Sequence, residues 1–207
     1  MTRALVFDVG EVLTRPAFDL FDRLEPLIHR RIDGRGPFAP DGDARWQQLQ
    51  AGEITTEQYW NHVAESAGVA DWRRLFELIG RHFPIEMFDS AMLEFADEAK
   101  AAGHPIGILS NDMVAISGSE WVRTNPALAR FDAIVDATEI GYRKPAPEAY
   151  AAICDALQLE PKDLVFLDDT PACIEGAEAF GMRGVLVDSF NRAPARDIAR
   201  AWLARPE

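Results

Sequence analysis

The sequence has few cysteines, an excess of acidic over basic residues and no long apolar run, and these features exclude several classes of protein. Its two cysteines, Cys154 and Cys173, are too few for a disulfide framework or a zinc site with several cysteine ligands. Its 21 lysines and arginines stand against 34 aspartates and glutamates, and the net charge of −13 argues against the basic surface that nucleic acid requires. No apolar run reaches the roughly 18 residues of a membrane span, and the N-terminus lacks a secretory signal pattern. We therefore expect a soluble cytoplasmic protein that binds neither nucleic acid nor membranes, while the oligomeric state is not readable.

Hydrophobic residues make up 48% of the 207 residues, enough to bury one core and a small second domain. From residue 88 onward, short apolar runs alternate with helical patterns, of which the first begins at Ser90 as its expected N-cap. The runs are residues 104–112 (HPIGILSND), 131–140 (FDAIVDATEI), 164–170 (LVFLDDT) and 184–190 (GVLVDSF), and residues 4–9 precede them as a first strand. This alternation predicts an α/β fold with a parallel sheet buried on both faces.

Residues 16–87 show helical periodicity and no strand pattern, so we expect a helical insert between the first and second strands. Within it, Thr55 and Gln58 have the spacing of a capping box, and Asp71 is an expected N-cap. Its tryptophans are expected in the insert's own core: Trp46, Trp60 and Trp72. The predicted domains are residues 1–15 with 88–207, which hold the sheet, and residues 16–87.

Polar residues follow the predicted strands at their carboxyl ends, where open parallel sheets bind ligands. They are Asp8 after the first strand, Ser110, Asn111 and Asp112 after the second, Lys144 after the third, and Asp168, Asp169 and Thr170 after the fourth. Taken singly, Ser110 or Asn111 could cap a helix, as could Asp169 or Thr170, and Lys144 could be a solvated surface residue. Together they indicate a site, because an acid such as Asp8 at the end of a buried strand requires a partner.

The charges of this set suggest its chemistry. Three carboxylates in one crevice, Asp8, Asp168 and Asp169, would repel each other unless a cation lies between them. Mg²⁺ prefers oxygen ligands and commonly binds one or two carboxylates together with a substrate phosphate. With the charge balanced, Asp8 could attack as a nucleophile, and Lys144 could hold phosphoryl oxygens and keep Asp8 ionised. Ser110 and the N–H groups at the following helix start could bind an anion.

Four motifs occur in order along essentially the whole chain: FDVGEVLT, ILSND, GYRKPAPEAY and VFLDDTPACIEGA. With these motifs the sequence resembles the haloacid dehalogenase superfamily of aspartate-nucleophile hydrolases. It is most similar to the group that includes bacterial sugar-phosphate phosphatases and the N-terminal phosphatase domain of soluble epoxide hydrolases. The resemblance implies a Rossmann-like catalytic core, with residues 16–87 as a small α-helical cap.

The resemblance also implies roles for individual residues. Asp8 would be the nucleophile that forms a phospho-aspartyl intermediate, and Lys144 would stabilise the transferring phosphoryl group. Ser110 and Asn111 would contact that group. The implied ligands of Mg²⁺ are Asp8, the backbone carbonyl of Gly10, Asp168 and Asp169, with Asp168 as a second ligand or as support.

The sequence departs from the family pattern at two positions. Gly10 stands where most phosphatases of the superfamily have an aspartate that acts as general acid and base. The absence of such a group typically lowers the rate by about 10²- to 10⁴-fold. Glu11 or Asp112 could substitute through a water molecule. Cys173 stands where Asp or Asn is usual, and a thiol is a poor partner for Mg²⁺.

The predicted function is Mg²⁺-dependent hydrolysis of small phosphorylated metabolites. Sugar 1-phosphates are favoured because a good leaving group suffers least from the missing acid. One alternative is a true haloacid dehalogenase, which needs no acid for the leaving halide, although the acidic pair would repel an anionic haloacid. A second is a weakly active or inert member that only binds a phosphorylated ligand or a partner protein.

Overall fold

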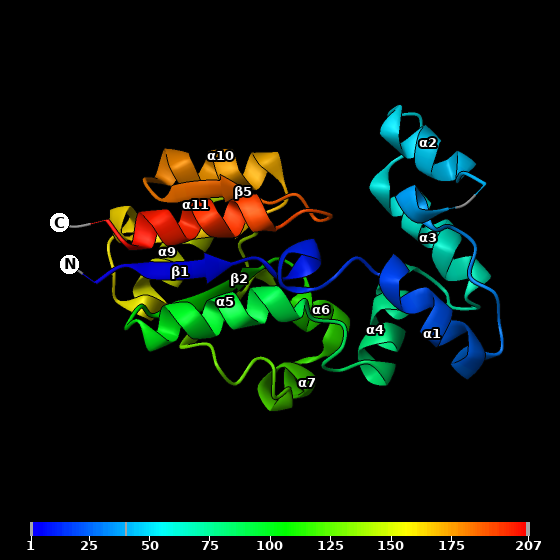
Figure 1. The fold of residues 1–207 in the computed structure, drawn as a ribbon, viewed down its shortest axis with the longest axis horizontal. Coiled ribbons are helices and arrows are strands. Elements are labelled where there is room, and N and C mark those ends of the chain that lie inside the picture. Colours follow the sequence, from blue (N-terminus) through cyan, green and yellow to red (C-terminus); the bar gives the residue numbers. More distant parts are fainter. Residues whose placement is uncertain (1, 40, 206–207) are drawn as a thin grey trace. The chain divides into compact units, whose positions relative to one another are not determined.

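The computed structural model describes residues 2–39 and 41–205, and the chain divides into two compact units (Figure 1). Residues Met1–Arg15 and Phe88–Glu207 form the first, here called the sheet unit, and Pro16–Met87 form the second, the helical unit. Among the described residues, no helix has the length and apolar content to cross a membrane.

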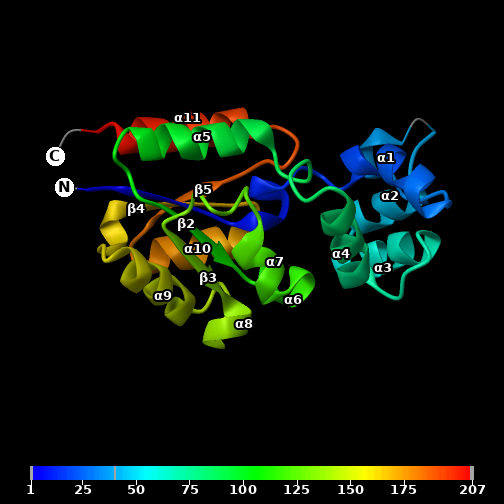
Figure 2. The same cartoon turned by 90° about the horizontal axis from the view of Figure 1, so that it is seen from below.

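The sheet unit is built on five parallel strands in the order β3-β2-β1-β4-β5. The strands are β1 (Ala4–Phe7), β2 (Ile106–Ser110), β3 (Ala133–Asp136), β4 (Leu164–Asp168) and β5 (Arg183–Leu186). The helices of this unit are α5 (Ser90–Ala101), α6 (Met113–Ser117), α7 (Ser119–Thr124), α8 (Ala137–Ile140), α9 (Pro147–Leu157), α10 (Pro171–Phe180) and α11 (Ala193–Leu203). Helices α5 and α11 cover one face of the sheet, and α9 and α10 cover the other (Figure 2). The predicted α/β fold with a parallel sheet is confirmed.

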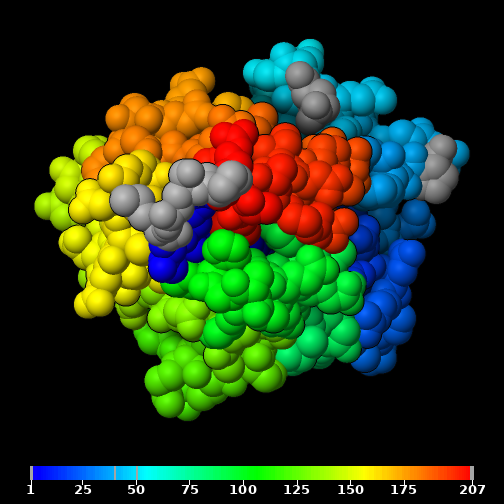
Figure 3. All heavy atoms as spheres, turned by 60° about the vertical axis from the view of Figure 1, so that its left-hand side comes forward, coloured from blue at the N-terminus to red at the C-terminus, as the bar shows by residue number. Residues whose placement is uncertain are grey.

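Burial on both faces explains why the strands are almost continuously apolar. Every residue of β1, β2 and β4 is buried, as is usual for a parallel sheet covered by helices on each side. At the opposite end of the sheet from the strands' carboxyl ends, Arg3 donates hydrogen bonds to the carbonyls of Trp202 and Leu203, at 3.0 and 3.3 Å. The start of β1 therefore lies beside the end of α11 (Figure 3).

Two predicted boundaries in the sheet unit are wrong for the same reason, a side-chain cap. The run 131–140 is strand only in β3, because Asp136 accepts a hydrogen bond from the Thr138 N–H and begins helix α8. The N-cap of α5 is Asp89 rather than Ser90, since the Asp89 carboxylate accepts from the Met92 N–H at 2.9 Å. A carboxylate at the N-cap satisfies a backbone donor that the helix itself leaves unpaired.

The helical unit contains α1 (Phe18–Ile28), α2 (Ala44–Gln50), α3 (Thr56–Ser66) and α4 (Trp72–His82), with a short 3₁₀ turn at Gly36–Phe38. The predicted capping box is present, because Thr55 Oγ1 accepts from the Gln58 N–H and Gln58 Oε1 accepts from the Thr55 N–H. Helix α1 ends at Ile28, and His29 has a left-handed backbone with φ of 53°.

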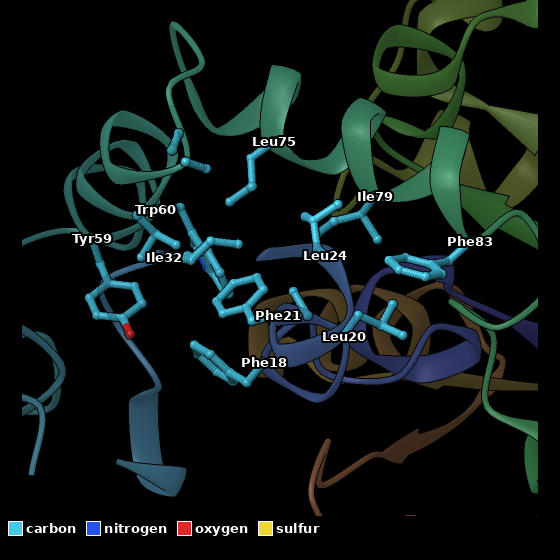
Figure 4. Close-up of a cluster of buried hydrophobic side chains, with 14 residues drawn as sticks. Phe18, Leu20, Phe21, Leu24, Ile32, Tyr59, Trp60, Leu75, Ile79 and Phe83 are labelled. Atoms are coloured by element: carbon cyan, nitrogen blue, oxygen red, sulfur yellow. The ribbon is translucent and has the colours of Figure 1, made fainter. Parts of the chain in front are cut away.

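A cluster of aromatic and aliphatic side chains, mainly from α1, α3 and α4, forms the core of the helical unit (Figure 4). Phe18 stacks on Trp60 with ring centroids 5.1 Å apart and packs edge-on against Tyr59. Trp60 is buried in this core, as predicted, whereas Trp46 and Trp72 are partly buried and pack against its margin. The helical unit therefore has a hydrophobic core of its own.

Candidate active site

The polar residues predicted at the strand ends meet at the carboxyl edge of the sheet. Asp8 directly follows β1, Ser110 is the last residue of β2, and Asp168 is the last residue of β4. Because β1 lies between β2 and β4 in the sheet, these three strand ends are neighbours. The edge formed by carboxyl ends is where open α/β sheets place their ligands.

Lys144 lies between two of these acids. Its Nζ donates to Asp8 Oδ1 at 2.5 Å and to Asp168 Oδ2 at 2.7 Å. The side chains of Lys144 and Asp168 are 2% and 1% exposed, and that of Asp8 is 13% exposed. Burial lowers the pKa of Lys144, but the two carboxylates outweigh burial and raise it above its ordinary value. Lys144 is therefore charged, and because an ammonium group has three N–H donors, one remains beyond the two given to the acids.

Three carboxylates lie close enough to share one cation. Oxygen atoms of Asp8, Asp168 and Asp169 all fall within 4.8 Å of one another. Burial raises the pKa of Asp8, and Lys144 opposes this shift. Burial, together with the charges of the neighbouring carboxylates, raises the pKa of Asp169 to about 7. Ionised together with Lys144, the group carries a net charge of −2, and its all-oxygen donor set fits a hard divalent ion such as Mg²⁺.

Asp168 and Asp169 are in different surroundings although they are adjacent. Asp168 accepts hydrogen bonds on both oxygens, from the Thr170 N–H at 2.8 Å and from Lys144 Nζ. Asp168 is also fully buried, whereas Asp169 is only partly buried. The arrangement makes Asp168 the anchor for Lys144 and leaves Asp169 as the more accessible of the two carboxylates.

The Ser110 hydroxyl oxygen accepts hydrogen bonds from the backbone N–H groups of Asp112 and Met113, at 3.2 and 3.0 Å. The next N–H group, of Val114, donates to Asp136 Oδ2 at 3.1 Å. These three N–H groups at the start of α6 were expected to bind an anion, but side-chain acceptors of the protein already occupy them. The Ser110 O–H proton remains available, because both hydrogen bonds use the oxygen as an acceptor.

Asn111 is also placed differently from the expectation of a contact to substrate. Its Oδ1 accepts from the backbone N–H of Lys144 at 2.8 Å, and its Nδ2 donates to the backbone carbonyl of Lys144 at 3.2 Å. The residues beside these two add a second link, because Arg143 donates to both carboxylate oxygens of Asp112, at 2.9 and 2.7 Å. The loop after β2 and the loop between α8 and α9 are thus joined beside Lys144.

Gly10 lies in the turn Val9–Leu13 that follows Asp8, and its own backbone is extended, with φ of −62° and ψ of 124°. A Cβ atom at Gly10 would lie 3.8 Å from Asp8 Oδ2, which is an ordinary van der Waals contact. The next residue, Glu11, is partly buried, and burial raises its pKa against a hydrogen bond from Ser189 and the charge of Arg192. Two acids could replace the missing general acid. Asp112 forms an ion pair with Arg143. Glu11 has a negative charge that contributes to the raised pKa of Asp169.

Sequence reasoning missed the residue that holds this turn in place. Arg192 donates to the carbonyls of Glu11, Val12 and Thr14, at 2.9, 3.1 and 2.7 Å, and lies 3.6 Å from a carboxylate oxygen of Asp89. It is separated from its partners in the turn by about 180 positions, and no local pattern in the sequence marks it. Asp136 was also missed, although it ends a strand in the way that Asp168 does.

Cys173, the second departure from the family pattern, is buried in α10. Burial raises the pKa of its thiol to about 11, so the thiol is protonated at neutral pH. Its backbone carbonyl accepts a hydrogen bond from the Tyr150 hydroxyl at 2.6 Å, which joins α10 to α9. These contacts make Cys173 part of the packing behind the acids, and a neutral thiol is a poor Mg²⁺ ligand.

The chain belongs to the haloacid dehalogenase-like hydrolase family, whose model matches residues 2–181. It is 29% identical to bifunctional epoxide hydrolase 2 of Sus scrofa in an alignment of 211 positions that covers 92% of this chain and 37% of that protein. It is 30% identical to validoxylamine A 7'-phosphate phosphatase of Streptomyces hygroscopicus over 70% of this chain and 69% of that protein. (S)-2-haloacid dehalogenase 1 of a Pseudomonas strain is 32% identical over 45% of this chain and 40% of the dehalogenase.

Solved structures share the fold. The crystal structure of a HAD-hydrolase of Bacillus subtilis bound to magnesium has a TM-score of 0.59, with 16% identity, 90% of this chain and 86% of that chain covered. A HAD-superfamily hydrolase of Geobacter sulfurreducens also has a TM-score of 0.59, with 19% identity and 90% and 87% covered. The chain spans only 36% to 42% of the length of several curated relatives.

Proposed function

We propose that this chain is a Mg²⁺-dependent phosphatase that hydrolyses small phosphomonoesters through a phospho-aspartyl intermediate on Asp8. The observation that carries this proposal is the group of three carboxylates around one buried lysine, with its net charge of −2 when ionised. A divalent cation would neutralise this group, whereas an anionic substrate alone would be repelled. Relatives named as phosphatases support the same reading.

Asp8 supplies the nucleophile. Its Oδ1 is held by Lys144, which leaves Oδ2 to attack the phosphorus atom while the bond from phosphorus to the leaving oxygen breaks. Water then attacks the phosphorus of the acyl phosphate, releases inorganic phosphate and regenerates the Asp8 carboxylate. The ion pair with Lys144 favours the ionised form that this attack requires, against the burial that disfavours it.

Lys144 and Ser110 bind the phosphoryl oxygens. Lys144 has one N–H beyond the two that it gives to the acids, and Ser110 has a free hydroxyl proton. Both donors are preorganised by contacts within the protein, so they need little rearrangement as negative charge develops on the transferring group.

Asp8, Asp169 and the carbonyl of Gly10 would hold Mg²⁺, while Asp168 serves chiefly to anchor Lys144. When bound, Mg²⁺ supplies charge neutralisation and orients the phosphate. The likeness in fold to a magnesium-bound hydrolase supports this assignment. The helical unit would act as a cap that excludes water and selects the substrate.

The proposed substrates are esters whose alcohol leaves readily, with sugar 1-phosphates as the specific candidate. Gly10 removes the usual general acid that would protonate the leaving oxygen. An anomeric oxygen needs this protonation less than an ordinary alkoxide does, because the ring oxygen lowers the basicity of the departing group. The ratio of rates on sugar 1-phosphates and alkyl phosphates measures this preference.

A second candidate is dehalogenation, which Gly10 and the similarity to a haloacid dehalogenase favour. The two reactions differ in where water attacks. Water attacks phosphorus in a phospho-aspartyl intermediate but attacks the Asp8 carbonyl carbon in the ester that dehalogenation forms. In ¹⁸O-labelled water, a single turnover therefore labels the released phosphate in the first case and the Asp8 carboxylate in the second.

The direct test is phosphate release from a panel of phosphomonoesters, with Mg²⁺ and with a chelator, using Asp8→Asn as control. Release that requires Mg²⁺ and disappears in Asp8→Asn is the expected result. No release above the control on any compound would contradict the proposal. Halide release from 2-haloacids in the presence of chelator would then identify a dehalogenase, and binding of phosphate with neither activity would identify an inert binder.

A further inference from the structure

The side chain of Asn111 is directed at the backbone of Lys144. Both functions of its amide are bonded there, with Oδ1 to the Lys144 N–H at 2.8 Å and Nδ2 to the Lys144 carbonyl at 3.2 Å. The backbone N–H can only donate and the carbonyl can only accept, so these two partners determine which end of the amide is oxygen. The pair resembles the reciprocal hydrogen bonds between two adjacent strands.

The position of the Lys144 ammonium group depends on such a restraint of the Lys144 backbone. A lysine side chain has a flexible four-carbon stem, yet its Nζ lies within hydrogen-bond distance of two different carboxylates, Asp8 and Asp168. The loop between α8 and α9 carries Lys144, and no strand or helix includes that residue. Without a fixed backbone, the ammonium group could follow either acid or leave the edge of the sheet.

The same loop is restrained from the other side by close packing. A Cβ atom at Gly176 in α10 would lie only 2.7 Å from Pro145 Cβ, so α10 touches the residue that follows Lys144. On the β2 side, Asn111 bonds both backbone groups of Lys144, and Arg143 also donates to the Asn111 carbonyl at 3.2 Å. The lysine backbone is therefore clamped between α10 and the loop that carries Asn111.

We propose that Asn111 is a positioning residue, which holds the Lys144 backbone so that the ammonium group reaches Asp8, and that it acts on the reaction through Lys144 rather than by binding the phosphoryl group. Its kinetic consequence rests on the phosphatase function proposed above. Its structural consequence, the hydrogen bond to the Lys144 N–H, does not depend on any activity.

A double-mutant cycle separates positioning from direct contact. In the wild-type background, Asn111→Ala is expected to lower kcat by about 10²-fold, the order of loss that a small misplacement of a catalytic group causes, with a smaller change in KM. In the Lys144→Met background the same substitution is expected to change kcat less than about threefold, because residues that act as a unit are not additive. Equal losses in the two backgrounds would show direct contact with substrate and overturn the proposal.

Asn61→Ala is the matched control. Asn61 is also half-buried, and its Oδ1 accepts a backbone N–H, that of Trp72, at 3.0 Å. Its loss is expected to lower the melting temperature while leaving kcat unchanged. A similar fall in kcat for Asn61→Ala and Asn111→Ala would assign the effect to general loss of stability and contradict the positioning role.

Hydrogen exchange of the Lys144 backbone amide gives a readout that needs no turnover. Exchange is expected to be at least about tenfold faster in Asn111→Ala than in the wild type, and to stay slow in Asn111→Asp, which keeps the Oδ1 acceptor. Unchanged exchange in Asn111→Ala would refute the proposal by itself. If the wild type hydrolyses no phosphomonoester, the proposed function fails, and the exchange rates still decide whether Asn111 holds Lys144.

Discussion

Asp169 is expected to make the metal-free protein less stable as the pH rises toward neutrality. Burial, reinforced by the neighbouring carboxylates, raises the pKa of Asp169 from 3.8 to about 7. Between these values the folded protein holds a proton that the unfolded chain has lost, so the free energy of unfolding falls as the pH rises through this window and then levels off. At about 1.36 kcal/mol for each pH unit, this corresponds to about 4 kcal/mol.

The substitution Asp169→Asn removes the titrating group and keeps its shape. In chelator, the variant should equal the wild type in stability near about pH 4 and exceed it by up to about 4 kcal/mol near about pH 8. Urea unfolding at a series of pH values measures the difference. Asp155→Asn, which changes an exposed acid of α9, is the matched control and should follow the wild-type curve.

Mg²⁺ should reverse the order of stability. Added Mg²⁺ should stabilise the wild type more near about pH 8 than near about pH 5, because a protonated Asp169 cannot serve as a ligand. It should stabilise Asp169→Asn much less. If the wild type and Asp169→Asn have parallel stability curves from about pH 4 to about pH 8 in chelator, the reasoning from burial and charge is refuted.

Three further substitutions test other parts of the site. The aspartate of Gly10→Asp would have room beside Asp8 Oδ2 and should raise kcat on alkyl phosphates by about 10²-fold or more. Equal rates for Gly10→Asp and Gly10→Asn would contradict proton transfer by the introduced aspartate. Gly176→Ala places a methyl group 2.7 Å from Pro145 Cβ. This close approach should lower the free energy of unfolding by about 1–3 kcal/mol and should also lower kcat. If neither quantity changes, α10 does not restrain the Lys144 loop. Arg192→Met removes three hydrogen bonds to backbone carbonyls and should destabilise the protein by about 2–4 kcal/mol in urea unfolding, whereas a loss below about 1 kcal/mol would not fit.

The sheet could be predicted from the sequence because each strand is a short apolar run and the longer helices between the strands are periodic. Parallel strands bring their carboxyl ends to one edge, so the acids at the ends of β1 and β4 had to be neighbours once the strand order placed β4 beside β1. This reasoning indicated that Asp8 and Asp168 share one edge with Lys144, and the distances of 2.5 and 2.7 Å to Lys144 Nζ place the three side chains together. The roles of these residues in catalysis stay predictions.

Contacts between loops could not be read from the sequence. Asn111 is 33 positions from Lys144, and its two hydrogen bonds depend on loop conformations that no periodic pattern encodes. The capping of α6 by Ser110 was visible only as one alternative among several. Helix α8 was missed because a four-residue helix has too few residues to show a period, and only the Asp136 cap marks where β3 ends.

The central claim is that Asp8 carries the phosphoryl group during turnover. The most direct measurement is a rapid acid quench of the protein mixed with Mg²⁺ and its best phosphomonoester substrate, followed by mass spectrometry of the peptide that contains Asp8. We expect an added phosphoryl group on Asp8 that is absent in Asp8→Asn and in chelator. Phosphate release at full rate with no modified Asp8 at any quench time would show that water attacks the substrate directly and would contradict a phospho-aspartyl intermediate.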